Sequence, residues 1–471
     1  MVVGESIGQT DVAIIGAGPG GYIAAIHLAE LGKRVTIIDR EAVGGVCLHH
    51  GCIPTKAMIH AAEFYHEVEQ ANRFGVSVEN LKIDFPKLQS WKKKIVDNLD
   101  NGIRRLLQHH QIQLLQANAF FETSYKLCLR PVTGTSLDIN ALEFHQCIIA
   151  TGSKERLLPN VPIDGQKIIT SNEILEIGSL PKSLLVIGGG YIGIEISQML
   201  AKLGVEVHLV ESLPSILNLL DEEFSQVVQK QLEKLNARIY VSSQVLQSRI
   251  EGDQVRTTLQ TPNGNQNIVT DKVLIAIGRV PNTEELQIRN THVKTDAKGY
   301  ILTNNQMRTD DQRIYAIGDV RGGIMLAHKA AFEAKIAAEA ICGKKSIFDN
   351  YIPYAIFSDP EIAGVGLTEK EAKEKNIQYK VTRFNSTNLA KVQISGCANA
   401  FYKILYDLQK NILGVHIVGP RSSDLIGQAV LAMEMGATVE DLSLIIYSHP
   451  SIVEGYGEVS ELAMGYPTNT F

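Results

Sequence analysis

The feature of the sequence that most constrains its fold is a pattern of apolar run, glycine turn, helix and second apolar run that occurs twice. The first copy runs from Asp11 to Asp39 and the second from Leu184 to Glu211. Both contain a Gly-x-Gly-x-x-Gly turn, with glycines at Gly16, Gly18 and Gly21 in the first copy and at Gly188, Gly190 and Gly193 in the second. Apolar runs that flank a helix in this way form βαβ units of a parallel sheet. The chain is therefore predicted to contain two Rossmann-like α/β domains.

Each glycine turn is followed by an acidic residue at the end of the next predicted strand. A Gly-x-Gly-x-x-Gly turn lets the backbone approach a pyrophosphate, and the acid binds ribose hydroxyls. Asp39 and Glu211 each stand 23 residues after the first glycine of their turn. A lone glycine turn often serves only helix packing, but two copies in register favour two bound dinucleotides. Glu211 would repel the extra phosphate of NADP, and neither His208 nor Ser212 adds a strong positive charge, so NAD is predicted.

Two cysteines, Cys47 and Cys52, follow the first unit, whereas the other four cysteines are scattered along the chain. A disulfide between them requires the backbone to leave a regular helix, which Gly51 permits. Pro54 suits the first turn of a helix, so Cys52 is expected at a helix N-terminus, where the dipole favours the thiolate. A catalytic disulfide is the favoured interpretation in an intracellular enzyme with two dinucleotide sites.

The cysteine pair has a second interpretation, as buried thiols or as half of a zinc or iron–sulfur site. His49 and His50, which lie between the cysteines, leave zinc open. No second set of cysteines or histidines has the spacing of a metal cluster. No bound metal is therefore predicted.

The charge of the chain argues against nucleic acid and anionic membranes as partners. Its 45 basic and 51 acidic residues give a formal charge of −6 and are mixed along the sequence, so no field of one sign arises. The only basic run, Lys92-Lys93-Lys94, is predicted to lie on the solvent-facing side of a helix. Met1–Thr10 lacks the features of a secretory signal, and no run approaches the ~18 apolar residues of a membrane span. A cytoplasmic protein is expected.

The length of 471 residues predicts three or four domains, since single hydrophobic cores stop growing at about 250–300 residues. A long polar helix is predicted from Phe85 to about His110, and an alanine-rich helix from His328 to Ile341. From Tyr351 onward, β segments alternate with helices, and the stretch Ala429–Met435 has the composition of a buried helix. This last block is predicted to form a separate α+β domain.

The segment from Gly44 to Lys56, Gly-Gly-Val-Cys-Leu-His-His-Gly-Cys-Ile-Pro-Thr-Lys, resembles the active-site signature of the pyridine nucleotide–disulfide oxidoreductases. The resemblance extends over essentially the whole chain, with matching motifs at 150–152, 276–279, 316–319, 357–361, 413–420 and 449–454. It implies an α/β fold with two Rossmann-like domains, for FAD and NAD, and a C-terminal α+β dimerisation domain. The implied boundaries are 1–150 for the FAD domain, 151–279 for the NAD domain, 280–350 for a central domain that completes the FAD site, and 351–471 for the dimerisation domain.

The resemblance also implies roles for particular residues. Cys47 would be the outer sulfur that exchanges with substrate, and Cys52 the inner sulfur that lies against the flavin. Lys56 would reach the flavin and pair with Glu195. His449, oriented by Glu454, would act as the base from the neighbouring subunit of a homodimer, and the His449–Pro450 bond is expected to be cis. The cofactor-binding residues would be Gly16, Gly18, Gly21, Asp39, Gly45, Lys56, Thr151, Gly152, Asp319, Gly188, Gly190, Tyr191, Gly193, Glu211 and Gly278, with Tyr191 covering the empty nicotinamide pocket.

Within the family, Cys52–Lys56 and Leu413–Pro420 are most similar to the branch whose members oxidise dihydrolipoamide with NAD, and this activity is predicted. The resemblance implies the lipoyl domain of an acyltransferase, or a glycine-cleavage carrier protein, as partner. His49-His50 and Tyr447 depart from the common pattern and leave another thiol substrate open. Mercuric reductase would carry extra cysteines near the carboxyl end, and glutathione reductase would carry basic residues near Glu211; the sequence has neither. The intact cysteine pair disfavours a scaffold protein that has lost the reaction.

Overall fold

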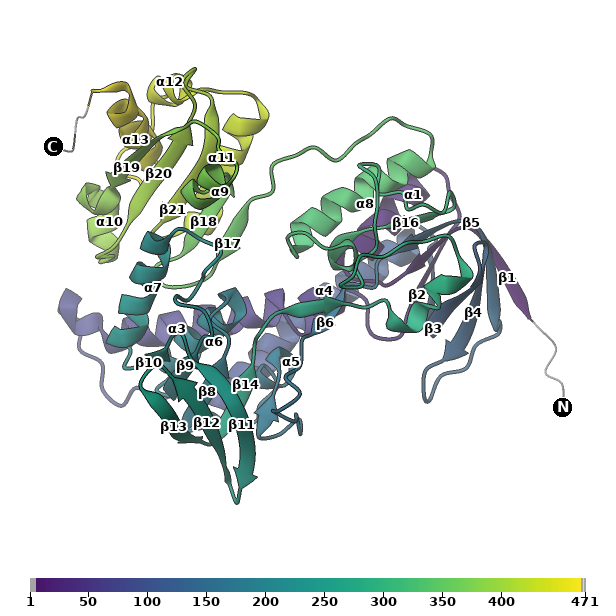
Figure 1. Cartoon of the computed structure of the whole chain (residues 1–471), viewed down its shortest axis with the longest axis horizontal. Coiled ribbons are helices and arrows are strands. Elements are labelled where there is room, and N and C mark those ends of the chain that lie inside the picture. Colours follow the sequence, from purple (N-terminus) through teal and green to yellow (C-terminus); the bar gives the residue numbers. More distant parts are fainter. Residues whose placement is uncertain (1–5, 467–468, 470–471) are drawn as a thin grey trace.

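The computed structural model describes residues 6–466 and 469. The expectations for Met1–Thr10 and for the carboxyl end therefore lie partly outside the described residues. In Figure 1 one α/β layer lies at the right, a second at the bottom and a third, yellow-green sheet at the upper left. Within the described part of the chain, no helix is long and apolar enough to cross a membrane.

The first sheet combines the first glycine-turn unit with a strand that comes much later in the chain. Its order is β1-β2-β3-β4-β5-β16, and β1 also pairs with β5. The strands are β1 (Ile7–Ile15), β2 (Val35–Asp39), β3 (Gln113–Thr123), β4 (Lys126–Pro131), β5 (Ala141–Ile149) and β16 (Ile314–Ala316). The parallel strands β1 and β2 are apolar runs because helices cover the sheet, among them α1 (Pro19–Glu30) and α8 (Ala327–Ile341). Since β16 pairs in parallel with β5, the chain returns to complete this sheet after leaving the second unit.

The second sheet is built around the second glycine-turn unit. It is parallel, with the order β10-β9-β8-β14-β7. Its strands are β7 (Ile168–Ile169), β8 (Ser183–Ile187), β9 (Glu206–Val210), β10 (Arg238–Tyr240) and β14 (Lys272–Ile275). Its helices are α5 (Ser171–Ile174), α6 (Tyr191–Lys202) and α7 (Glu222–Lys234), and an antiparallel meander of β11 (Gln244–Glu251), β12 (Gln254–Thr261) and β13 (Gly264–Thr270) covers it. Strands β6 (Ser153–Glu155) and β15 (Arg279–Pro281) pair where the chain crosses between the two sheets.

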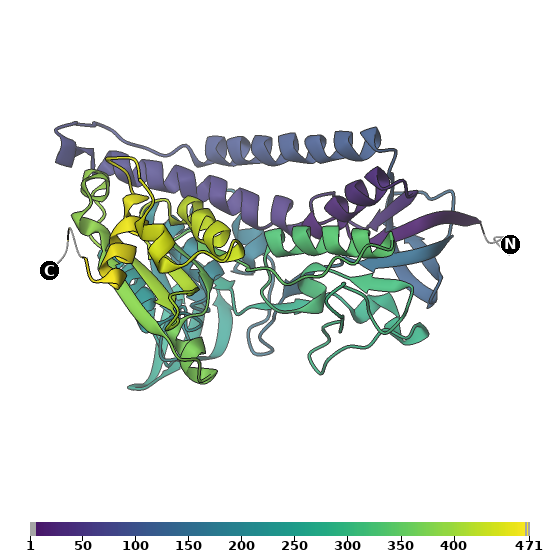
Figure 2. The same cartoon turned by 90° about the horizontal axis from the view of Figure 1, so that it is seen from above.

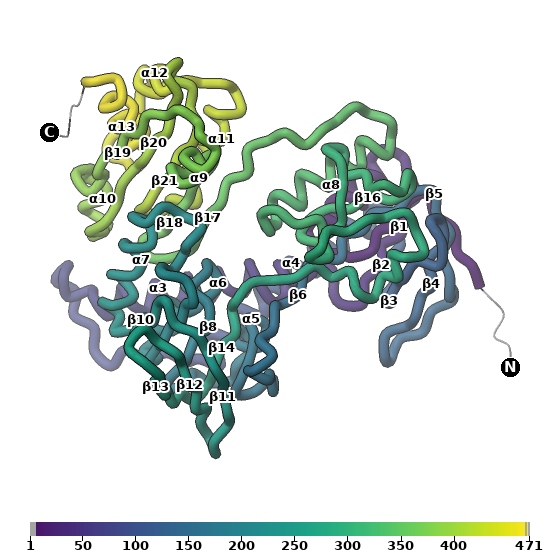
Figure 3. Tube along the Cα trace, viewed as in Figure 1, coloured from purple at the N-terminus to yellow at the C-terminus, as the bar shows by residue number. Residues whose placement is uncertain are grey.

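The terminal domain is a five-stranded antiparallel sheet with helices, in the order β17-β18-β21-β20-β19. Its strands are β17 (Tyr354–Ile356), β18 (Ile362–Gly366), β19 (Lys380–Asn385), β20 (Phe401–Tyr406) and β21 (Ile412–Val418). Its helices are α9 (Glu369–Glu374), α10 (Ala390–Ser395), α11 (Ser422–Glu434), α12 (Val439–Ser443) and α13 (Glu454–Met464). A short 3₁₀ turn of this domain lies at Ser386–Asn388. The other 3₁₀ turns of the described residues lie earlier in the chain, at Ala71–Phe74, Glu284–Leu286, Ile288–Asn290 and Gly318–Arg321. The green tube in Figure 3 crosses from α8 to β17, which places this domain beside the second sheet.

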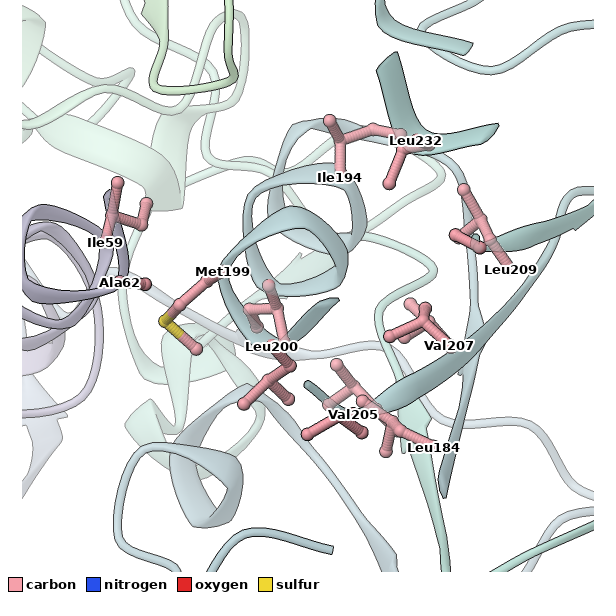
Figure 4. Packing of buried hydrophobic residues seen from close by; sticks show 14 of the residues in the cluster. Ile59, Ala62, Leu184, Ile194, Met199, Leu200, Val205, Val207, Leu209 and Leu232 are labelled. Carbon is pink, nitrogen blue, oxygen red and sulfur yellow. The ribbon is translucent and has the colours of Figure 1, made fainter. Parts of the chain in front are cut away.

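Two long helices, α3 (Cys52–Glu69) and α4 (Phe85–His109), run along one side of the molecule in Figure 2. The short helix α2 (Gly45–His49) precedes α3. In Figure 4, Ile59 and Ala62 of α3 lie next to Met199 of α6, within one buried apolar cluster. This packing joins the helix that begins at Cys52 to the helix that follows the second glycine turn.

The basic run on α4 corrects one prediction. Lys93 is 73% exposed and pairs with Asp97, whereas Lys92 is only 2% exposed. The Lys92 ammonium donates to the carbonyl oxygen of Leu175 at 2.5 Å and to the carboxylate of Glu176 at 2.6 Å. The prediction of a solvent-facing run was wrong for Lys92 because the end of α5 lies over it, a tertiary contact that helical periodicity cannot reveal.

Candidate active site

The first glycine turn has two kinds of glycine. Gly16 has φ +105°, and a Cβ there would meet the carbonyl oxygen of Ala150 at 2.2 Å; a Cβ on Gly21 would meet the carbonyl oxygen of Gly16 at 1.8 Å. The fold itself requires these two glycines. Gly18, the N-cap of α1, has φ −66°, and nothing lies within 4 Å of its Cβ position. Any residue could adopt this backbone conformation, so the open space at the helix N-terminus fits a ligand that approaches the backbone closely.

The second turn repeats this arrangement. Gly188 has φ +112°, and its Cβ would meet the carbonyl oxygen of Ala276 at 2.3 Å, while that of Gly193 would meet the Gly188 carbonyl oxygen at 2.0 Å. Gly190, the N-cap of α6, has φ −75° and an empty Cβ position. Both turns therefore fit a pyrophosphate at a helix N-terminus.

The acidic residues after the turns fold back onto them. Asp39 accepts the Ala17 N–H at 2.5 Å, and Glu211 accepts the Gly189 N–H at 2.7 Å through Oε2 and the Leu213 N–H at 2.8 Å through Oε1. No lysine or arginine among the described residues forms an ion pair with Glu211, so no cation offsets its charge toward a second anion. This environment disfavours a phosphate beside Glu211.

One cavity gathers most of the predicted site residues. It is lined by Gly16, Gly18, Asp39, Gly45, Cys47, Cys52, Lys56, Thr151, Gly152, Tyr191, Glu195 and Asp319, among others. Gly21, Gly188, Gly190, Gly193, Glu211, Gly278, His449 and Glu454 do not line it. The cavity therefore extends from the first glycine turn to the cysteines. The second glycine turn lies outside the cavity, but residues of α6, the helix that follows this turn, line it.

Cys47 lies in α2 and Cys52 begins α3, and the two helices are separated by a break at His50 and Gly51. Gly44 and Gly45 have φ +92° and +56°, and a Cβ on Gly45 would come within 2.8 Å of the Gly18 Cα. Close approach of α2 to the first turn thus requires glycine there. Both cysteines are free thiols in the structure, and Cys52 is the first residue of α3, as predicted.

The two thiols differ in acidity. A hydrogen bond from Cys47 and the nearby charge of Lys56 outweigh burial and lower the pKa of Cys52 to about 7. The same hydrogen bond, together with burial, raises the pKa of Cys47. Cys52 is therefore the thiolate of the pair and Cys47 the thiol.

Lys56 and Glu195 form an ion pair beside Cys52. Their charged atoms are 2.7 Å apart, and the Glu195 side chain is only 3% exposed, against 31% for Lys56. The pair meets because α3 and α6 pack side by side. A buried carboxylate paired with an ammonium at the cavity wall places a cation next to a thiolate.

The cavity wall at the crossing between the sheets is held by polar contacts. Ser153 donates to Asp319 at 2.6 Å, and Arg279 donates from Nε to Ser153 at 2.7 Å. Thr151 donates to the Asn282 carbonyl oxygen at 2.7 Å. The left-handed conformations of Gly152 and Gly278, with φ of +68° and +106°, allow the two sharp turns of this crossing.

Tyr191, the first residue of α6, lines the cavity and is 42% exposed. Burial and the nearby Asp319 carboxylate raise the pKa of Tyr191 to about 12. Its phenol is therefore neutral at physiological pH. That its ring covers a nicotinamide pocket stays a prediction.

His449 and Glu454 do not line the cavity that holds Cys47 and Cys52 of the same chain. His449 Nδ1 is 2.8 Å from Glu454 Oε2, and the His449 side chain is 74% exposed. Hydrogen bonds from His449 and Ser451 outweigh burial and lower the pKa of Glu454. The His449–Pro450 bond is cis, as predicted. The imidazole is thus oriented but faces solvent, with no cysteine of its own chain beside it.

The loop before His449 carries a large apolar surface. Leu444, Ile445 and Ile446 are 76%, 46% and 97% exposed. Leu431 on α11 and Met435 directly after this helix are 60% and 76% exposed. The other side of α11 is buried in its own domain through Ala429, Ala432 and Met433. Exposed large apolar side chains in this number within one domain are typical of a protein interface.

Sequence reasoning missed two contributors to the site. Phe357 lies with its ring 4.6 Å from the Lys56 ammonium, and its N–H donates to Glu195 at 3.0 Å. His50 lines the cavity and has a buried Nδ1 for which the described residues offer no hydrogen-bond partner. His50 and Phe357 each belong to a motif noted in the sequence, at 44–56 and 357–361. No sequence spacing, however, indicates that Phe357 lies next to Lys56.

The sequence matches the profile of the pyridine nucleotide-disulphide oxidoreductase family over residues 10–334 and the profile of that family's dimerisation domain over residues 352–460. The chain therefore belongs to this family. The predicted fold, two dinucleotide-binding domains followed by a C-terminal dimerisation domain, is confirmed.

Full-length relatives are named dihydrolipoyl dehydrogenase. The one from Geobacillus stearothermophilus is 38% identical and covers 99% of both chains, and the one from Thermus scotoductus is 39% identical and covers 96% of both. The crystal structure of LpdA from Mycobacterium tuberculosis has a TM-score of 0.89 at 25% identity and covers 97% of this chain and 100% of its own. The flavoprotein disulfide reductase RclA from Escherichia coli shares the fold, with a TM-score of 0.86 at 24% identity over 96% of this chain and 99% of its own.

Proposed function

We propose that the protein oxidises dihydrolipoamide to lipoamide and passes the two electrons through Cys47 and Cys52 and FAD to NAD. The observation that carries the proposal is the single cavity in which a cysteine pair with one acidic thiol meets the first dinucleotide cradle and the α6 N-terminal residues. Full-length relatives with the name dihydrolipoyl dehydrogenase support this substrate.

The residues present fit both cofactors. Gly18 and Asp39 would hold the pyrophosphate and ribose of FAD, with Gly45 and Asp319 along the rest of the molecule, and Gly190 and Glu211 would hold NAD. FAD supplies two-electron chemistry between a dithiol and a nicotinamide when it is bound. The chain's part is to place a thiolate, Cys52, and a cation, Lys56, at the cavity wall.

The cysteine pair performs the thiol exchange. In the oxidised enzyme a substrate thiolate attacks Cys47, the Cys47–Cys52 bond breaks, and Cys52 leaves as a thiolate. The second thiolate of the substrate then attacks the substrate sulfur that is bonded to Cys47. This forms the disulfide of lipoamide and releases Cys47 as a thiolate. The substrate loses two electrons and the pair gains them. The low pKa of Cys52 makes it the better leaving group.

The proton on the substrate thiol needs a base, and His449 with Glu454 is the oriented imidazole available. Because His449 faces solvent in its own chain, we infer that it serves the cysteines of a partner subunit. The dimerisation domain and its exposed apolar surface support a homodimer.

The physiological partner belongs to the same proposal. A dihydrolipoamide group reaches such an enzyme on a lipoyl domain of an acyltransferase or on a glycine-cleavage carrier protein. Four scattered cysteines in addition to the redox pair suit a cytoplasmic location, where thiols stay reduced.

The test compares two substrate pairs in steady state: dihydrolipoamide with NAD, and glutathione disulfide with NADPH. The proposal expects turnover only with the first pair. Turnover with glutathione disulfide and NADPH, but none with dihydrolipoamide, would replace it by a glutathione reductase function.

A further inference from the structure

The Lys56–Glu195 pair is held by a residue of the terminal domain. The Lys56 ammonium lies 4.6 Å from the centre of the Phe357 ring. The carboxylate of Glu195 accepts from Lys56 through Oε2 and from the backbone N–H of Phe357 through Oε1, at 2.7 and 3.0 Å. One residue thus contacts both members of the pair, although it lies outside the cavity.

This contact is part of a longer junction along one face of α6. Glu195, Gln198 and Lys202 are three and four positions apart and share this face. Gln198 exchanges two hydrogen bonds with the backbone of Asp359, at 2.7 and 3.1 Å, and Lys202 pairs with the Asp359 carboxylate at 2.8 Å. The helix that begins at the second glycine turn therefore fixes the position of residues 357–359, which follow β17, the first strand of the terminal domain.

We propose that Phe357 is a positioning residue that holds the Lys56 charge beside Cys52 through the face of its ring. This inference rests on the proposed function, because it concerns the same redox site. A lysine side chain has four rotatable bonds and the Lys56 end is partly exposed, so one ion pair leaves it free to pivot about Glu195. An aromatic face attracts an ammonium and restricts that motion.

The consequence appears at Cys52, because the charge of Lys56 stabilises its thiolate. The titratable and charged groups that act on Cys52 are Cys47 from α2, Lys56 from α3, and Glu195 and Tyr191 from α6. Of these, Phe357 touches only the Lys56–Glu195 pair. Weakening the ring contact should therefore raise the pKa of Cys52 and leave Cys47 and the cavity wall in place.

The experiment replaces Phe357 site-specifically with phenylalanines that carry one, two, three or four ring fluorines. Fluorine withdraws charge from the ring face but changes the size of the side chain little. The full-length, FAD-loaded enzyme is reduced by two electrons with dithionite, and the thiolate–flavin charge-transfer absorbance is titrated against pH. Dithionite supplies the electrons, so the result does not depend on whether dihydrolipoamide is the substrate.

The expected result is a midpoint that moves to higher pH with each fluorine. The full series should lower the thiolate-to-thiol ratio of Cys52 at fixed pH by ~2- to 5-fold. The same fluorinated residues at Phe384, a fully buried ring of the terminal domain for which no cation–π contact is found among the described residues, should leave the midpoint unchanged.

Two results would overturn the proposal. A midpoint that moves in Phe357→Leu but not in the fluorinated series would assign Phe357 to packing alone. An equal shift from fluorination at Phe384 would assign the effect to the domain as a whole. If Phe357→Leu does not fold, the fluorinated series still decides, because a midpoint independent of fluorine number refutes the ring contact.

Discussion

At the scale of single residues, Cys47 and Cys52 have the same chemistry but different surroundings. Only Cys52 begins an 18-residue helix, and it receives the hydrogen bond of the Cys47 thiol in addition to the nearby charge of Lys56. The Cys47 thiol donates a hydrogen bond to the Cys52 sulfur, so Cys47 carries the proton and Cys52 the negative charge. When a thiolate attacks a disulfide between them, Cys52 is therefore the better leaving group.

The first prediction concerns the charge-transfer absorbance between thiolate and oxidised flavin. It should be absent in Cys52→Ser and present in Cys47→Ser, in which a hydroxyl can still donate to Cys52. Because the lowered pKa of Cys52 is about 7, the band should rise as the pH increases through about 7 and fade below it. In Cys47→Ala, loss of the donor should move the midpoint upward by ~1–2 pH units. Equal bands in the two serine variants would contradict the assignment, and a band in Cys52→Ser alone would reverse it.

The second prediction concerns Glu211 and the choice between NAD and NADP. A phosphate that meets this carboxylate without a cation loses ~2–4 kcal/mol, so kcat/KM should favour NAD by roughly 30- to 700-fold. Glu211→Gln should reduce this preference about tenfold, mainly through better use of NADP. Glu206→Gln, a half-exposed residue at the start of β9, the strand that Glu211 follows, should keep it. The measurement is kcat/KM with each cofactor for the three proteins, and equal efficiency in the unmodified enzyme would contradict the role of Glu211.

At the scale of elements, the sequence predicted what local patterns determine. The long helix from Phe85 to about His110 is observed as α4, Phe85–His109, because its apolar periodicity and its N-cap are local. The two glycine turns were predictable for the same reason, because each is defined by glycines close together in the sequence. What could not be predicted depends on contacts between elements distant in the chain: the burial of Lys92 under α5, and the ring of Phe357 beside Lys56.

The third prediction belongs to the junction of α4 and α5. Lys92 is buried and bonds the Leu175 carbonyl at the end of α5, so Lys92→Met would leave that oxygen unsatisfied. The variant should lose ~1–3 kcal/mol of stability. Lys93→Met, which changes an exposed lysine in the adjacent position, should change it by less than about 0.5 kcal/mol. The measurement is the urea midpoint followed by tryptophan fluorescence, and equal midpoints for the two variants would show that the buried contact adds nothing.

At the scale of the whole molecule, the proposed role of His449 makes a single chain an incomplete enzyme. The cavity holds the thiols and the cation, whereas the imidazole that Glu454 orients, His449, does not line it and faces solvent. The apolar residues Leu444–Ile446 lie five to three positions before it. A second subunit that covers this apolar loop would bring the imidazole to a cavity at the same time. Burial of the interface and completion of the site are then one event.

The last prediction tests this arrangement by mixing two inactive proteins, Cys47→Ser and His449→Gln, under conditions that exchange subunits. If each site takes its cysteines from one chain and its histidine from the other, the mixed dimer has one site with both lesions and one with neither. Up to about half of the unmodified activity per mixed dimer should then return. The control mixes Cys47→Ser with Cys52→Ser, because each site of that dimer lacks one cysteine and no activity can return. Exchange is verified by different tags on the two chains. Without recovery in verified mixed dimers, His449 would have to serve the cysteines of its own chain, which the exposed position of its imidazole in the single chain argues against.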